Sequence, residues 1–159
     1  MRKELQEQLC KNYPAIFEDV GNPESAMRWG IAVGDGWYEI INDLCSIIQS
    51  HLDWCNSTGH YAARGPMKHI EEAPQLKATQ VKEKFGGLRF YVMGDTEYSR
   101  GVITMAERLS RRTCEDCGMP GKDHGHGYQA TRCSACDDKW VKLRDERQAQ
   151  EQARYAKST

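Results

Sequence analysis

The chain has 159 residues, which suits one domain with a core of its own, or one domain with a small metal-held appendix. Lysine and arginine number 22 against 23 aspartates and glutamates, a formal net charge of −1, so no strong positive field attracts nucleic acid. The first residues lack an apolar signal sequence, and no stretch approaches the roughly 18 apolar residues of a membrane span. These features predict a cytoplasmic protein.

The first third of the chain predicts a short helix followed by a short strand. Residues 2–12 have the pattern of a charged helix that ends before Pro14. Trp29, Ile31 and Val33 then alternate with smaller or polar residues, which is the period of a half-buried strand.

A long amphipathic helix is expected to follow the turn at 34–36. Apolar residues recur at helical spacing over 37–52, and Asp35 is placed to cap the N-terminus of this helix. This helix is the predicted centre of the core. The polar segment 56–74 predicts a long loop, and such loops in compact domains are functional or mobile.

A β-hairpin and a second helix complete the predicted body. The runs 81–85 and 88–92 flank Gly86-Gly87, a pair that takes the positive φ angles of a tight turn. The segment 96–112 predicts a helix that begins at a polar cap. Its expected core-facing residues are Tyr98, Val102, Met105, Ala106 and Leu109. The predicted fold class is α+β, with a small antiparallel hairpin packed on a long helix.

Two Cys-x-x-Cys pairs form the sharpest motif of the chain. Four thiolates surround Zn²⁺ as a closed tetrahedron with Zn–S distances of about 2.3 Å, and each two-residue spacer directs both sulfurs at the same ion. We therefore expect one structural zinc ion per chain. The order of knuckle, hairpin, second pair and helix is that of a treble-clef or zinc-ribbon module. The predicted ligands are Cys114, Cys117, Cys133 and Cys136.

The run Asp123-His124-Gly125-His126 lies between the two cysteine pairs. In this arrangement the chain resembles phage junction-resolving endonucleases of the endonuclease VII type, which have a zinc-held ββα fold. The resemblance implies a metal-dependent DNA endonuclease in which His124 or His126 activates water and Asp123 holds Mg²⁺. A glycine-rich exposed loop without a catalytic role is the alternative for the same residues.

A second resemblance runs through Cys114-Glu-Asp-Cys117-Gly-x-Pro and Arg132-Cys133-x-x-Cys136. In this part the chain is similar to bacterial and phage zinc-finger regulators that enter the secondary channel of RNA polymerase. A zinc-finger regulator that binds nucleic acid is therefore a second alternative, with Arg111 and Arg112 as its contacts.

A third resemblance rests on three motifs taken together, Gly34-Asp-Gly-Trp37, Val81-Lys-Glu-Lys-Phe-Gly-Gly-Leu-Arg-Phe-Tyr91 and Cys114-Glu-x-Cys-Gly-x-Pro-Gly. These motifs resemble those of a set of small uncharacterised proteins of bacteria and phages. The resemblance covers the chain from about residue 30 to residue 137. It implies an α+β body with a zinc module, in a phage or prophage setting.

The closed metal site, the near-neutral charge and the lack of a complete catalytic set predict a non-enzymatic interaction protein. We expect a phage-encoded accessory factor that binds and modulates a host or phage protein, such as a defence or transcription component. The predicted parts are a body (1–112), a zinc-binding module (113–143) and a polar C-terminal helix or tail (144–159). The expected contact surfaces are the 56–74 loop and the side chains of Arg108, Arg111, Arg112, Arg132 and Tyr128.

Overall fold

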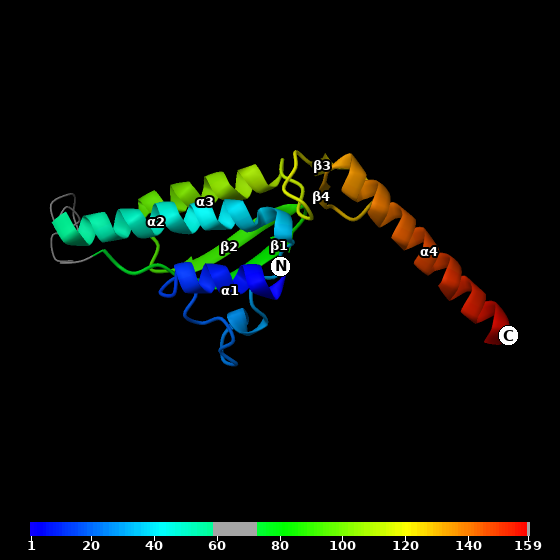
Figure 1. The fold of residues 1–159 in the computed structure, drawn as a ribbon, viewed down its shortest axis with the longest axis horizontal. Helices are drawn as coiled ribbons and strands as arrows, with labels where there is room; N and C mark the ends of the chain where they lie inside the picture. The colour runs from blue at the N-terminus through cyan, green and yellow to red at the C-terminus, as the bar shows by residue number, and fades with distance from the viewer. Residues whose placement is uncertain (59–72, 159) are drawn as a thin grey trace.

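The structure, a computed structural model, describes residues 1–58 and 73–158. In chain order the elements are α1 (Lys3–Asn12), two 3₁₀ turns (Ala26–Trp29 and Asp35–Trp37), α2 (Tyr38–Thr58), β1 (Lys77–Lys84), β2 (Gly87–Met93), α3 (Glu97–Ser110), β3 (Lys122–Asp123), β4 (Thr131–Arg132) and α4 (Ser134–Ser158). Figure 1 shows α2 and α3 side by side over the β1–β2 hairpin, and α4 extending away from the rest of the molecule. The predicted α+β class is confirmed.

One hydrophobic core joins the β1–β2 hairpin to the helices of the body. Its buried residues come from α1, α2, α3, both strands and the segment between α1 and α2. Burial of one large apolar side chain contributes about 1.5–3 kcal/mol, and α2 supplies six buried residues, so this helix is the main element of the core as predicted. The largest fully buried side chains include Trp37, Leu9, Ile16, Met27, Ile41, Leu44, Ile48, Leu76, Leu88 and Val81.

The hairpin is confirmed, with longer strands and a different turn from those predicted. β1 and β2 pair antiparallel from Lys77 opposite Met93 to Lys84 opposite Gly87. The turn residues are Phe85 and Gly86, with φ angles of 52° and 70°, and Gly87 already belongs to β2. A two-residue hairpin turn of type I′ needs positive φ at both residues, and here Phe85 takes the first position although it is not glycine.

Both edges of this two-stranded sheet are covered. On the β2 edge, the Leu88 N–H donates to Ser110 Oγ at 2.8 Å and the Phe90 N–H donates to Glu107 Oε1 at 3.1 Å. On the β1 edge, the backbone of Ala32 donates to the Val81 carbonyl at 2.9 Å. An isolated two-stranded hairpin is marginally stable in water, so these contacts from α3 and from residue 32 are needed to hold it.

Ser110→Ala is expected to destabilise the protein by about 1–3 kcal/mol, because it leaves the buried N–H of Leu88 without an acceptor. Chemical denaturation of the two proteins measures the difference. Thr104→Ala on the exposed side of α3 removes a hydroxyl that bonds only its own helix, to the Arg100 carbonyl at 2.8 Å, and should change stability by less than about 0.5 kcal/mol. Equal effects of the two substitutions would contradict the role given to Ser110.

The strand predicted around Trp29, Ile31 and Val33 is wrong. A 3₁₀ turn covers Ala26–Trp29, and only Ala32 forms a single parallel bridge, to Lys82. Gly30 has a φ of 73°, which interrupts the extended backbone, and Trp29 is 80% exposed instead of facing the core.

The predicted core-facing stripe of α3 is confirmed at Ala106, which is buried, and at Val102, which packs against the core, but it is wrong for the other three residues. Tyr98, Met105 and Leu109 are exposed, and the buried positions are Ser99, Ile103, Ala106 and Ser110. The two serines reach these positions because their hydroxyls have local partners. Ser99 forms a capping box with Thr96 at the N-terminus of α3, and Ser110 Oγ donates to the Glu107 carbonyl at 2.7 Å.

The N-terminus of α2 does not use the predicted cap. Asp35 lies in the 3₁₀ turn before the helix, and its carboxylate accepts from the Arg2 backbone N–H at 2.7 Å and pairs with the Arg2 guanidinium. At its other end α2 extends to Thr58, so the first residues of the predicted 56–74 loop are helical. Residues 59–72 of that loop lie outside the described residues.

The C-terminal segment forms one helix, α4, from Ser134 to Ser158. The boundary that was predicted between 143 and 144 falls inside this helix, so the segment 144–158 continues the helix that begins at the second cysteine pair. Among the helices of the described residues, none combines the length and the apolar character that crossing a membrane requires.

Candidate metal centre

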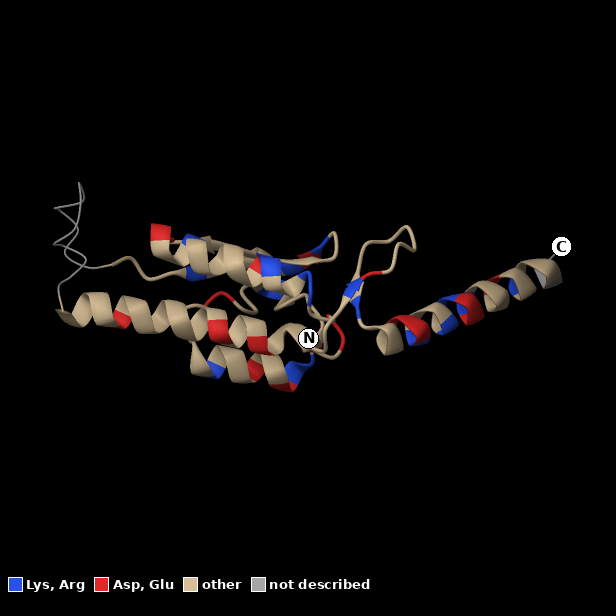
Figure 2. Ribbon diagram, turned by 90° about the horizontal axis from the view of Figure 1, so that it is seen from above, with Lys and Arg blue, Asp and Glu red and all other residues tan. Residues whose placement is uncertain are grey.

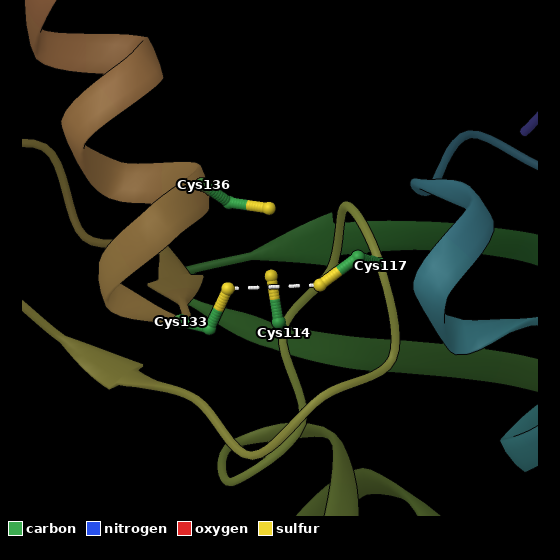
Figure 3. Close-up of side chains that lie close together, drawn as sticks. All are labelled: Cys114, Cys117, Cys133 and Cys136. Carbon is green, nitrogen blue, oxygen red and sulfur yellow. Dashed lines mark hydrogen bonds between the residues drawn. The ribbon is translucent and has the colours of Figure 1, made fainter.

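The four predicted cysteine ligands come together in one cluster. The sulfurs of Cys114, Cys117, Cys133 and Cys136 all lie within 4.8 Å of one another, and those of Cys117 and Cys133 are 3.6 Å apart. Figure 3 shows the four side chains pointing toward a common centre. A tetrahedral site with metal–sulfur distances of about 2.3 Å has sulfur–sulfur edges of about 3.8 Å, so the cluster fits one metal ion. Four thiolates close the coordination sphere and leave no open position for a substrate.

Short elements place these cysteines. The first pair lies in a tight knuckle, where the Gly118 N–H donates to the Cys114 carbonyl at 2.9 Å and Gly118 has a φ of 79°, the conformation for which glycine is suited. The hairpin β3–β4 follows, and Cys133 and Cys136 lie at the start of α4. This is the predicted order of knuckle, hairpin, second pair and helix.

The thiols of the cluster differ in acidity. The backbone N–H of Cys136 lowers the pKa of the Cys133 thiol to about 7, whereas burial raises the pKa of Cys114 and Cys136. A metal ion binds cysteines as thiolates, so binding at this cluster is expected to release protons and to depend on pH.

The knuckle is docked directly on the body, at the turn before α2. The Gly36 N–H donates to the Glu115 carbonyl at 2.8 Å, and the Gly34 N–H donates to Glu115 Oε1 at 2.9 Å. The indole Nε1–H of Trp37 donates to the Thr113 carbonyl at 2.8 Å. Burial raises the pKa of the Glu115 carboxyl above its ordinary value. The turn Gly34-Asp-Gly-Trp37 is thus the site on the body against which the first cysteine pair packs.

Close approach of the two backbones explains the glycines of this motif. A Cβ atom at position 36 would overlap the Cys114 carbonyl and would lie 2.7 Å from the Cys117 nitrogen. A Cβ at position 34 would lie 2.9 Å from the carbonyl carbon of Glu115. The sequence does not indicate this contact by itself, since Gly-Asp-Gly before a helix is also an ordinary turn. The one signal for this contact in the sequence is that the Gly-Asp-Gly-Trp turn and the Cys-x-x-Cys knuckle are both present in the chain.

The metal module also contacts the tip of the body hairpin. Thr131 Oγ1 donates to the Gly86 carbonyl at 2.6 Å, and the Glu115 N–H donates to the Thr131 carbonyl at 2.9 Å. The cysteine cluster is therefore held between the turn before α2 and the tip of β1–β2.

His124 and His126 converge on a carboxylate, which is that of Asp137 and not of Asp123. His126 Nε2 donates to Asp137 Oδ2 at 2.8 Å, and His124 Nδ1 lies 3.4 Å from the same oxygen. His124 Nε2 donates to the carbonyl of Arg132 at 3.1 Å. Asp137 is buried, whereas Asp123 is exposed and accepts from the Gly125 N–H at 3.0 Å. The histidines therefore tie the β3–β4 loop to the first turn of α4.

The five side chains predicted as partner contacts are not equivalent. Arg108 and Arg112 are exposed, and Arg111 is exposed but donates to the Phe85 carbonyl at 3.2 Å. The Arg132 side chain is only 13% exposed, because it pairs with Asp116 and lies over the Trp140 ring. The Tyr128 ring is exposed, and its hydroxyl donates to Glu83 at 3.2 Å. Arg132 is therefore part of the metal module and not a free surface contact.

Comparisons of the chain with protein-family models, with curated proteins and with solved structures find no match.

Proposed function

We propose that the protein is a non-enzymatic, zinc-stabilised interaction protein that binds another protein. In this proposal it is encoded by a phage and acts in the cytoplasm of the bacterial host, where it modulates a host component of defence or transcription. The phage setting is supported by the resemblance of the motifs around Gly34-Asp-Gly-Trp37, 81–91 and the first cysteine pair. The observation that carries the proposal is that the exposed C-terminal part of α4 extends from the four-cysteine site.

The metal ion in this proposal is zinc, with one ion per chain. Four thiolates in a tetrahedral set are the donors of structural zinc sites, and they leave none of the open positions that catalytic zinc sites use. Elemental analysis of the purified protein tests the identity and the number of the ions.

The first turns of α4 are fixed at the metal centre. Cys136 contributes a ligand and Asp137 binds the two histidines of the β3–β4 loop. The Trp140 ring stacks on His126, with centroids 5.8 Å apart, and lies below the guanidinium of Arg132. The direction of α4 is therefore set by the metal module.

Beyond this anchored start, every side chain from Asp145 to Ala156 is exposed; we call residues 145–156 the α4 arm. Most helices in proteins are stabilised by packing of one face. A helix that is polar all round depends instead on ion pairs between residues four apart or on contact with another domain or protein, and we propose the second of these for the α4 arm. The arm carries Arg147 and Arg154 against Asp145, Glu146 and Glu151, so its charge favours a protein partner over nucleic acid.

The experiment is an affinity pull-down from bacterial host lysate with the full chain as bait. We expect one protein to be recovered in stoichiometric amount, and we expect it to be lost when the charges of the arm are exchanged by Arg147→Glu with Glu151→Arg. The matched control exchanges Lys3 and Glu7 on α1, an exposed pair with the same spacing and a distance of 3.5 Å, and should leave recovery unchanged. Recovery of no stoichiometric protein contradicts the proposal.

A metal-dependent DNA endonuclease is the second candidate, because the two histidines converge with a carboxylate beside the metal module. In that case His124 or His126 activates water next to a divalent ion, as in the nuclease class that the motif resembles. Branched or nicked DNA should then be cleaved with Mg²⁺, and His124→Ala should abolish cleavage. If the DNA stays uncleaved with each of a series of divalent metal ions, the endonuclease function is ruled out.

A further inference from the structure

The outer side of the α2–α3 helix pair carries exposed apolar side chains. Ile47 on α2 and Tyr98, Met105 and Leu109 on α3 are between 42% and 65% exposed, and we call these four residues the apolar stripe. Positions 98, 105 and 109 lie on one face of α3, with the half-buried Val102 between them. This spacing of alternately four and three residues is the pattern by which one helix packs against another.

The stripe is continuous across the two helices, because they are antiparallel neighbours. The ring of His51 stacks on that of Tyr98, with centroids 3.8 Å apart, which joins the C-terminal half of α2 to the first turn of α3. At the opposite end, Trp37 just before α2 bonds to Thr113 just after α3. Ile47 lies one turn before His51 on the same side of α2. Because His51 contacts α3 through Tyr98, Ile47 also lies on the side of α2 that borders α3.

The two flanks of the stripe carry opposite charges at the same end. Glu39 and Asp43 are exposed near the N-terminus of α2, a helix without lysine or arginine, and its ribbon in Figure 2 shows red but no blue segments. Arg108 in the last turn of α3 and Arg112 just after it are exposed, and this end of α3 lies beside the N-terminus of α2. Within the part of the chain that the structure describes, these four residues form no ion pair.

A surface with an acidic flank and a basic flank is complementary to itself. A two-fold axis that runs parallel to the helices and between two copies places α2 of one copy against α3 of the other, with their matching ends together. Glu39 and Asp43 of each copy then face Arg108 and Arg112 of the other. An axis perpendicular to the helices would instead place α2 on α2 with its direction reversed, so that Glu39 and Asp43 would face the other end of α2 and would lie far from the arginines.

We propose that the apolar stripe is the contact surface of a homodimer, in which the α2–α3 pairs of two copies pack face to face as four helices. The stripe supplies the apolar centre of this contact and the two charged flanks set its orientation. Nucleic acid does not fit the same surface, because the α2 flank is acidic. This inference goes beyond the proposed function, which concerns the α4 arm.

The first experiment measures the mass of the full-length, metal-loaded protein by sedimentation at about 100 µM, where weak homodimers are populated. We expect a dimer for the natural sequence. Met105→Glu places a charge in the centre of the stripe and should weaken the association at least tenfold. Far-UV circular dichroism should be unchanged, because Met105 is 65% exposed in the single chain. A monomer for the natural sequence, or a Met105→Glu protein that dimerises equally well, overturns the proposal.

The second experiment exchanges the flanks. One variant carries Glu39→Arg with Asp43→Arg, and another carries Arg108→Glu with Arg112→Glu. Each alone opposes like charges in both halves of the contact and should be a monomer. An equimolar mixture opposes unlike charges in both halves, so it should form a heterodimer whose affinity falls as salt is added. Dimers of either variant alone, or a mixture that stays monomeric, contradict the proposed orientation.

Discussion

A Cys117→Ser protein is expected to lose its metal ion and to unfold over residues 113–143. The same outcome is expected for Cys114, Cys133 and Cys136, since one serine opens a site that four thiolates close. Apparent binding energies of structural zinc are roughly 10 kcal/mol or more, which exceeds the stability that short elements such as β3 and β4 gain from their own packing. We therefore expect the folding of this segment to depend on the metal ion.

Elemental analysis and amide hydrogen exchange measure this outcome. Protection should disappear over β3, β4 and the start of α4, and it should weaken at Gly34 and Gly36, whose N–H groups bond to Glu115 in the knuckle. Cys10→Ser is the matched control, because Cys10 lies on α1 outside the cluster and should keep one metal ion per chain. A Cys117→Ser protein with a full complement of metal and unchanged exchange would contradict the assignment of the site.

Gly36→Ala should be among the most damaging substitutions outside the cysteines, with a loss of about 4 kcal/mol or more. The added methyl group would overlap the Cys114 carbonyl and the Gly118 nitrogen, which are backbone atoms fixed by the knuckle. The turn at Gly36 or the knuckle has to move, and either movement breaks the Glu115 bonds and shifts Cys114 from the metal. We expect weaker metal binding in a competition assay with a chelator, together with the loss of stability.

Gly101→Ala is the control for the same chemical change. Gly101 lies within α3, and a Cβ atom there has no neighbour within 4 Å. Alanine is the better helix former, so this substitution should stabilise the protein by about 0.5–1 kcal/mol. Should Gly36→Ala prove as harmless as Gly101→Ala, the close docking of knuckle and body would be wrong.

The metal cluster could be predicted from the sequence because its spacing alone determines the chemistry. Two residues between the cysteines of each pair bring both sulfurs to one ion, whatever the rest of the chain does. The convergence of His124 and His126 on Asp137 could not be predicted in the same way. It depends on where the first turn of α4 lies relative to the β3–β4 loop, and the Asp123-His-Gly-His run favours the nearer carboxylate.

Helix α2 could be predicted because its apolar residues recur at helical spacing and all of its buried residues are apolar. For α3 the apolar pattern placed three of five residues wrongly, because Ser99 and Ser110 are buried with their hydroxyls bonded locally and take positions that a hydrophobic pattern assigns to larger residues. The exposed apolar residues that remain are those for which we propose a dimer contact. The error in the predicted core and the proposed interface therefore have the same origin.

The docking of the knuckle on the Gly34–Trp37 turn also dictates when the chain can finish folding. The hydrogen bond from Gly34 to Glu115 spans 81 residues, and Cys136, the last ligand, follows later still. Contacts of such long range form late, because a long loop must close first. During synthesis the turn at Gly34–Trp37 therefore lacks its packing partner until the knuckle has left the ribosome, and the set of four cysteines is complete only after residue 136.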